Sequence, residues 1–134
     1  MIYLSIGSNL GERDKNLRLA VNLLQQVALQ NIKCSPMLAT EAIMLPGSPV
    51  DWNRPYLNVV LKGQSGLLPE ALLQEIKRIE KTMGRLAEYD KWSPRIIDID
   101  ILLWDNLCIN TPDLVIPHPE LYNRKFLEYL LGLL

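Results

Sequence analysis

Apolar residues recur in two parts of the chain with the three- or four-residue spacing of an amphipathic helix. The first helix is predicted to begin near Asp14, a candidate N-cap residue, and the second at Pro69, because proline suits the first turn of a helix. Gly84 is expected to end the second helix. The predicted buried faces consist of Leu17, Val21, Leu24 and Ala28 in the first helix and of Leu72, Ile76, Ile79 and Met83 in the second.

Runs rich in β-branched and aromatic residues predict strands at residues 2–6, 56–64 and 95–104. Residues 32–44 are interpreted as an irregular edge strand, because Pro36 cannot donate a hydrogen bond to a ladder. A short extended piece and a loop-rich tail are expected after the last strand. The predicted order is βαββαβ, which favours an α+β fold, an antiparallel ferredoxin-like sheet with both helices on one face.

The composition bounds the fold and its partners. The chain of 134 residues, 49% of them hydrophobic, is expected to form one domain, residues 1–134, around a single core. Fourteen Lys and Arg residues nearly balance fifteen Asp and Glu residues, so neither nucleic acid nor an anionic membrane is an expected partner.

Signals of export and of membrane insertion are missing from the sequence. No apolar run reaches the ~20 residues of a membrane helix, and the N-terminal stretch lacks the pattern of a signal peptide. Cys34 and Cys108 lie among apolar neighbours without metal-ligand spacing. They are predicted to be buried thiols of a reduced, cytoplasmic protein.

Two predicted connections, residues 44–55 and 84–94, are longer than the ~6 residues of most links in compact domains. The second combines cationic and aromatic side chains, among them Arg85, Tyr89 and Trp92. It could close over an anionic ligand, or it could be a solvated surface loop with one anchoring tryptophan. Composition alone does not separate these two interpretations.

The turn "GSNLG", residues 7–11, joins the first strand to the first helix. It lacks the lysine and the spacing of a phosphate-binding P-loop, and it does not match G-x-G-x-x-G. It is therefore interpreted as a tight turn, in which Gly7 allows close approach to a neighbouring wall.

Two carboxylates, Asp98 and Asp100, interrupt the most apolar run of the chain, "RIIDIDILLW". Side chains alternate along a strand, so both acids share the face opposite the neighbouring isoleucines and lie about 6 to 7 Å apart. Such a pair needs solvent, basic partners or a bound cation. Arg95 close by favours Mg²⁺ held beside a phosphate, although a solvated pair of acids stays a comparable interpretation.

Other polar residues allow both a structural and a functional interpretation. His118, the single histidine, could cap a surface turn between two prolines or bind phosphate. Asn58 could read the edge of a flat heterocycle or satisfy a loop backbone. Glu80 lies at the rim of the second helix's apolar face and could pair with Lys77 or Arg85, or reach a ribose.

Together these motifs resemble the 6-hydroxymethyl-7,8-dihydropterin pyrophosphokinase family, whose enzymes act before dihydropteroate synthase in folate synthesis. The resemblance runs from about residue 1 to residue 127 and is carried by "IGSNLG", "YLN", "IE" followed by "GR", "WSPRIIDIDIL", "IPHPEL" and "NRKF". The block W-x-P-R-x-x-D-x-D-I is highly specific. The resemblance implies a ferredoxin-like α/β/α sandwich, in agreement with the order read from the pattern.

The resemblance also implies a role for individual residues. Asp98 and Asp100 match the aspartates that hold two Mg²⁺ ions, and Arg85 and Arg95 match arginines that engage the phosphates; these four are the expected catalytic residues. The expected pterin contacts are Gly7, Thr40, Glu41, Ile43, Tyr56, Asn58, Trp92 and Phe126. The expected ATP contacts are Lys77, Glu80, Arg85, Trp92, Arg95, Ile101, His118 and Arg124.

The chain departs from the family's usual pattern mainly at nucleotide contacts. The departing positions are Lys77, Ala87, Asp113, Val115 and Pro119. It also ends earlier than a typical single-domain member, which fits either an absent C-terminal tail or the front part of a fusion with dihydropteroate synthase. A monomer is the expected state.

The implied reaction transfers diphosphate from ATP to the hydroxymethyl group of the pterin and releases AMP. Catalysis of this type depends on positioning and charge stabilisation. Two alternatives stay open on the D-x-D pattern alone. A metal-dependent glycosyl or nucleotidyl transferase would normally need a larger domain, and a non-enzymatic ferredoxin-like binding module would leave the acids solvated and free of metal.

Overall fold

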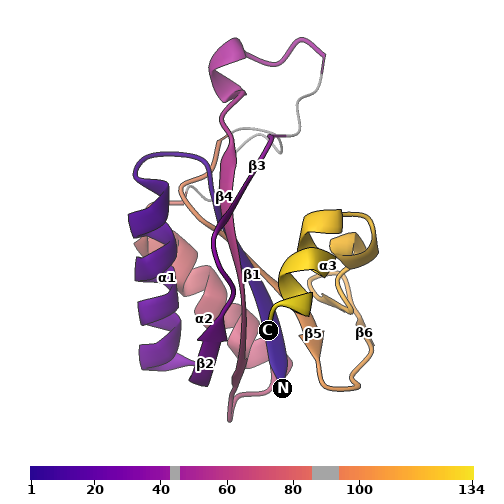
Figure 1. The fold of residues 1–134 in the computed structure, drawn as a ribbon. Helices are drawn as coiled ribbons and strands as arrows, with labels where there is room; N and C mark the ends of the chain where they lie inside the picture. Colours follow the sequence, from indigo (N-terminus) through magenta and orange to yellow (C-terminus); the bar gives the residue numbers. More distant parts are fainter. Residues whose placement is uncertain (43–45, 86–93) are drawn as a thin grey trace.

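A five-stranded antiparallel sheet lies at the centre of the fold in the computed structural model, which describes residues 1–42, 46–85 and 94–134 (Figure 1). Its strands are β1 Ile2–Ser8, β2 Gln30–Cys34, β3 Leu38–Thr40, β4 Tyr56–Gln64 and β5 Asp98–Trp104. The order across the sheet is β2-β4-β1-β5, and β3 also pairs with β4. The predicted mixed α/β class with an antiparallel sheet is confirmed, and β2 with β3 together form the second strand of the predicted order.

Helices cover both faces of this sheet. The predicted pair, α1 Arg13–Val27 and α2 Pro69–Thr82, lies on one face, whereas the shorter α3 Lys125–Gly132 lies on the other (Figure 1). The remaining described elements are the short strands β6 Ile109–Asn110 and β7 Val115–Ile116, and the 3-10 helices η1 Val50–Trp52 and η2 Pro119–Tyr122. No helix in the described part of the chain is long and apolar enough to cross a membrane.

Separate apolar clusters lie on the two faces of the sheet. The larger one packs the sheet against α1 and α2 and includes Leu4, Ile76 and Ile99. The smaller one packs it against α3 and η2 and is formed by Val60, Leu102, Leu121, Leu127 and Leu130. The expectation of a single core is therefore wrong, because α3 supplies an apolar cover for the second face.

Alternation along β5 divides its side chains between the faces as predicted. Ile99 and Ile101 belong to the larger cluster, whereas Asp98 and Asp100 face the α3 side. The strand begins at Asp98, later than the predicted residue 95. Only the direction of the acids matters for the site, and that direction is confirmed.

The predicted irregular edge strand is confirmed up to Thr40, whereas residues 41 and 42 are not in a strand and residues 43 and 44 lie outside the described residues. It is split into β2 and β3, with Ser35, Pro36 and Met37 between them. The Ser35 N–H donates to the Val60 carbonyl oxygen at 2.8 Å, and the Val60 N–H donates to Ser35 Oγ at 2.9 Å. The buried hydroxyl thus takes the place of a main-chain acceptor where the ladder along β4 is interrupted.

The start of α1 and the C-terminal tail differ from the predictions. The residue before α1 is Glu12, which makes no side-chain capping hydrogen bond, and Asp14 lies within the first turn instead of capping it. The tail was expected to be loop-rich but contains α3. The spacing of Leu127 and Leu130 carries the helical signal, which the preceding prolines obscured.

Both cysteines are free and exposed, so the prediction of buried thiols is wrong. Cys34 ends the edge strand β2, and Cys108 lies in the connection between β5 and β6. Apolar neighbours in the sequence do not bury a side chain at a sheet edge or in a turn, because no second layer covers it.

Candidate active site

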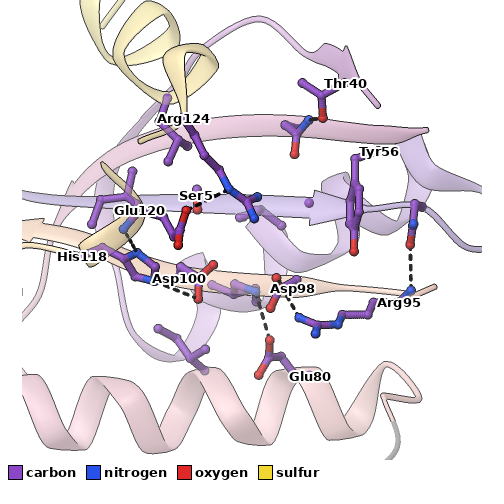
Figure 2. A pocket seen from close by; sticks show the side chains of 18 of the residues that line it. Ser5, Thr40, Tyr56, Glu80, Arg95, Asp98, Asp100, His118, Glu120 and Arg124 are labelled. Atoms are coloured by element: carbon purple, nitrogen blue, oxygen red, sulfur yellow. Dashed lines mark hydrogen bonds and ion pairs between the residues drawn. The ribbon is translucent and has the colours of Figure 1, made fainter. Parts of the chain in front are cut away.

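A cavity of about 660 Å³ lies over β1, β4 and β5 beside α3, and it continues past the outer edge of β5 to α2 (Figure 2). On the sheet, Ser5 and Gly7 of β1 pair in register with Asp100 and Asp98 of β5. The side chains of β1 at these two positions are small. The acids therefore have open space beside them, which a bulky residue on β1 would fill.

The first acid is held by two arginines. Arg85 Nη1 donates to Asp98 Oδ1 at 3.0 Å, and Arg95 Nη1 donates to Asp98 Oδ2 at 3.3 Å. Both arginine side chains are only 15% exposed. Asp98 thus gathers two cations at one wall of the cavity, where charge-assisted hydrogen bonds are little screened by water.

Glu80 connects α2 to β5. Its carboxylate accepts a hydrogen bond from the Ile99 N–H at 3.0 Å and pairs with Arg85. The residue is 8% exposed, so this carboxylate replaces water as the partner of a buried main-chain donor. The expected pairing of Glu80 with Arg85 is confirmed.

Burial and mutual repulsion act against ionisation of these acids. Burial raises the pKa of Glu80, and the Arg85 charge and the Ile99 N–H oppose that rise. Burial also raises the pKa of Asp98, with a further contribution from the Asp100 charge, whereas Arg85 and Arg95 lower it. Arg85 therefore favours the ionised forms of the buried Glu80 and the half-buried Asp98, and Arg95 does the same for Asp98.

His118 both caps a turn and faces the second acid. Its Nδ1 accepts from the Glu120 N–H at 3.1 Å at the start of η2, and its Nε2 lies 3.7 Å from Asp100 Oδ1. The interaction with Asp100 raises the pKa of His118. Arg124 also lines the cavity, with Nε 3.4 Å from Glu120 Oε2. Figure 2 shows these side chains on the α3 side of the acids.

The opposite end of the cavity has a wall made by β1, β3 and β4. Asn58 Nδ2 donates to Thr40 Oγ1 at 2.8 Å and to the Leu38 carbonyl oxygen at 3.1 Å. These bonds turn Oδ1 towards Gly7, where an added Cβ would lie 3.1 Å from it. The same Cβ would lie 3.3 Å from the Tyr56 ring. Gly7 thus leaves an amide oxygen and an aromatic ring accessible on one wall.

Comparison with known proteins assigns the chain to a family. The sequence model of one family, described as 7,8-dihydro-6-hydroxymethylpterin-pyrophosphokinase, matches residues 3–133. The chain belongs to this family. Membership places it with pyrophosphokinases and not with the D-x-D glycosyl or nucleotidyl transferases.

Relatives of this chain include a protein named as a pyrophosphokinase and a larger bifunctional protein. The chain is 41% identical over 128 residues to 2-amino-4-hydroxy-6-hydroxymethyldihydropteridine pyrophosphokinase of Aquifex aeolicus, a match that covers 96% of this chain and 76% of that protein. It is 42% identical over 131 residues to the folate synthesis bifunctional protein of Chlamydia caviae, a match that covers 98% of this chain and 29% of that protein. The chain therefore spans less than a third of the length of this bifunctional relative.

Most residues that the pyrophosphokinase resemblance singled out line the one cavity. They are Gly7, Thr40, Glu41, Tyr56, Asn58, Lys77, Glu80, Arg85, Arg95, Asp98, Asp100, His118, Arg124 and Phe126. The side chain of Ile101 belongs instead to the larger apolar cluster. Ile43 and Trp92 lie outside the described residues, as do parts of the two long connections.

Sequence reasoning missed several residues that line the cavity. Ser5 could have been found, because alternation places it on the same face as Gly7. Asn9 carried no such signal, since its partners lie far along the chain. Glu120 was not singled out either, although its partners are near neighbours in the sequence. Leu73 also lines the cavity, although the pattern gave it no place on the buried face of α2.

Asp98 and Asp100 suit a Mg²⁺ site of the type found in enzymes that bind phosphate substrates. Among the described residues, no group of three or more His, Cys, Asp or Glu side chains could hold a metal ion. Mg²⁺ in kinase-like sites uses one or two carboxylates and completes its coordination with water and substrate phosphates. Asp98 and Asp100, on one face and beside open space, match that donor set.

Proposed function

We propose that this chain transfers diphosphate from ATP to the hydroxymethyl group of 6-hydroxymethyl-7,8-dihydropterin in folate synthesis. The hydroxyl oxygen forms a bond to the β-phosphorus and loses its proton, the bond from that phosphorus to the α-phosphate oxygen breaks, and AMP leaves. One observation carries the proposal beyond family membership. A single cavity joins paired acids and arginines to an amide and aromatic wall.

The triphosphate end of the site is proposed to lie at the cationic side chains. Arg85 and Arg95 each bind one oxygen of the Asp98 carboxylate, and His118 and Arg124 lie on the α3 side. Positioned cations stabilise the charge that the transferring phosphoryl group develops, and they do so without reorganising. Asp98 and Asp100 would hold two Mg²⁺ ions, which would supply further charge neutralisation at the phosphate oxygens.

The nucleoside is proposed to bind where the cavity passes the outer edge of β5. Lys77 lines this part and is exposed, whereas Glu80 already has two partners. The main-chain groups of residues 99 and 101 point to the same side of the strand, and the Ile99 N–H faces away from β1 towards Glu80. We infer that Ile101 contributes its main chain, because its side chain packs in the core.

The pterin is proposed to occupy the wall around Asn58. Both amide N–H groups are engaged by β3, so the oxygen is the group that can accept from a flat heterocycle. Tyr56 and Phe126 line the same cavity and can stack against the ring faces. Thr40 and Glu41 line the same cavity and are further proposed contacts. Ile43 and Trp92 stay proposed pterin contacts on the family resemblance alone.

The purified chain is expected to release AMP from ATP and Mg²⁺ only when 6-hydroxymethyl-7,8-dihydropterin is added. A coupled AMP assay measures this, with 6-methyl-7,8-dihydropterin, which lacks the attacking hydroxyl, as the matched control. Absence of pterin-dependent AMP release from protein with a folded circular dichroism spectrum would contradict the proposal. We also propose that the chain is a monomer that acts in the cytoplasm, alone or beside dihydropteroate synthase. Sedimentation of the same sample tests the monomeric state.

Replacing Gly7 by Ala is expected to raise KM for the pterin about tenfold or more while KM for ATP changes little. The new Cβ would lie 3.1 Å from Asn58 Oδ1 and 3.3 Å from the Tyr56 ring, tighter than ordinary contact. Asn58 cannot yield freely because its amide is held by β3, so the added methyl group is expected to disturb the wall where the pterin is proposed to bind.

Gly66→Ala is the control for this substitution, since an added Cβ there meets nothing within 4 Å. Steady-state kinetics with each substrate varied in turn gives both KM values. Equal pterin KM values in the two variants would show that Gly7 has no part in forming the wall.

A further inference from the structure

Asn9 is a buried polar residue in the turn between β1 and α1, and all its hydrogen bonds given by the structure go to distant segments. It is 4% exposed. Its Nδ2 donates to the Arg54 carbonyl oxygen at 3.1 Å, and its Oδ1 accepts from the Arg95 N–H at 2.7 Å. Its own main-chain N–H donates to the Arg95 carbonyl oxygen at 3.1 Å. One residue therefore binds two segments that enter the cavity from different parts of the chain.

The contacts with Arg95 fix the main chain of that residue on both sides. Asn9 accepts from its N–H and donates to its carbonyl oxygen, so the peptide groups on either side of the Arg95 Cα are held. The Arg95 guanidinium then reaches Asp98 Oδ2 at 3.3 Å. Since the side chain starts from a held Cα, a shift of the main chain would carry the guanidinium away from the acid.

The contact with Arg54 holds the other side of the cavity. Arg54 and Pro55 end the segment that leads into β4, whose first residue is Tyr56. Arg13 Nη1 donates to the Pro55 carbonyl oxygen at 3.0 Å, next to the bond from Asn9. Figure 2 shows Tyr56 and Arg95 at the same end of the cavity.

The turn has hydrogen bonds of its own that do not involve the Asn9 amide. A second asparagine, Asn16, fastens it internally, with Nδ2 donating to Ser8 Oγ at 3.2 Å and to the Leu10 carbonyl oxygen at 2.9 Å. The Asn9 amide thus binds two distant segments and makes no hydrogen bond within its own turn among those the structure gives. That separation distinguishes a role in the site from a role in local folding.

We propose that Asn9 is a positioning residue for the transfer reaction, which holds the Arg95 main chain and the Arg54 end of the neighbouring segment in one arrangement. This inference rests on the proposed function. Asn9 acts through Arg95 and the start of β4, because its amide oxygen and nitrogen are already engaged by protein groups.

A double-mutant cycle with Arg95 tests the inference by kinetics. Asn9→Ala is expected to lower kcat about 10- to 100-fold, as misplacement by about 1 Å does in oriented sites. In an Arg95→Ala background the same change is expected to lower kcat by less than about threefold, because the group being positioned is gone. Asn16→Ala is the matched control and is expected to leave kcat within about threefold of the wild type.

Hydrogen exchange of the Arg95 amide supplies a readout that does not depend on activity. Asn9→Ala is expected to speed this exchange about tenfold or more relative to Asn16→Ala, since the Arg95 N–H loses its acceptor. Asn9→Asp keeps that acceptor and loses the donor to Arg54. It is expected to preserve the protection while lowering kcat, and it serves as the test variant if Asn9→Ala does not fold.

Each outcome bears on one proposal. The role of Asn9 would be overturned if the kcat losses of Asn9→Ala and Arg95→Ala multiplied fully in the double variant, or if Asn9→Ala and Asn16→Ala had equal kcat. Where Asn9→Asp is the test variant, a wild-type kcat or a loss of Arg95 amide protection would overturn it. Unchanged Arg95 exchange in Asn9→Ala would overturn it as well. Absence of AMP release by the wild type would instead overturn the proposed function, and the exchange measurement would still decide whether Asn9 holds Arg95.

Discussion

Asp98→Asn is expected to lower kcat for diphosphate transfer by about 10³-fold or more, and Asp100→Asn by a similar factor. The change keeps the shape of the side chain and removes its charge, so the pair of carboxylates that would bind Mg²⁺ is lost. Metal-assisted stabilisation of phosphate charge is worth several kcal/mol, which corresponds to a loss of this size. The activity that remains is expected to need a higher Mg²⁺ concentration.

Asp105→Asn is the control for these variants, because Asp105 follows β5, is 61% exposed and pairs with the N-terminus away from the cavity. The assay is AMP release over a Mg²⁺ titration, and circular dichroism establishes that each variant is folded. A kcat of Asp98→Asn within about tenfold of that of Asp105→Asn would rule out a metal-binding role for the first acid. The same comparison applies to Asp100.

Glu80→Ala is expected to lower the free energy of unfolding by about 3 to 5 kcal/mol. Removing one partner of a buried ion pair leaves the other charge uncompensated, and here the Ile99 N–H also loses its acceptor. Glu80→Gln is expected to lower the free energy of unfolding by less, because its amide oxygen can still accept from the Ile99 N–H. Urea unfolding followed by circular dichroism gives the free energies for both variants.

Glu75→Ala on the same helix is the matched control. Glu75 also pairs with an arginine, Arg78, but the Arg78 side chain is 70% exposed. Removing the Glu75 carboxylate is therefore expected to change the free energy of unfolding by under about 1 kcal/mol. If Glu80→Ala proved no more destabilising than Glu75→Ala, the connection between α2 and β5 would have no energetic importance. Weak activity with normal stability in Glu80→Ala would point instead to direct nucleotide contact.

Local sequence patterns predicted those structural features that depend only on residues adjacent in the sequence. The alternation around Asp98 and Asp100 predicted their common face, because the period of a strand is set by the backbone alone. Pro69 marked the start of α2 for a similarly local reason. The same reasoning failed for Asp14, since several polar residues precede α1 and only the folded turn decides where the helix starts.

The cysteines and the tail show where local reasoning ends. Apolar neighbours suggested that Cys34 and Cys108 are buried, but exposure depends on whether another layer covers the segment. The helix α3 covers the second face of the sheet, and its apolar positions were present in the sequence although they were not recognised. A side chain's burial is a property of the packed elements and not of its sequence neighbours.

The sequence by itself determined the order of the main strands and helices, the face of the acids on β5 and the resemblance to the pyrophosphokinase family. Only the tertiary structure decided which partners those residues have. Asp98 lies between Arg85 and Arg95, Glu80 binds the Ile99 N–H, and Asn9 holds Arg95, a residue 86 positions away. Periodicity along the chain reports the direction of a side chain, whereas a hydrogen bond between distant segments depends on how the layers pack.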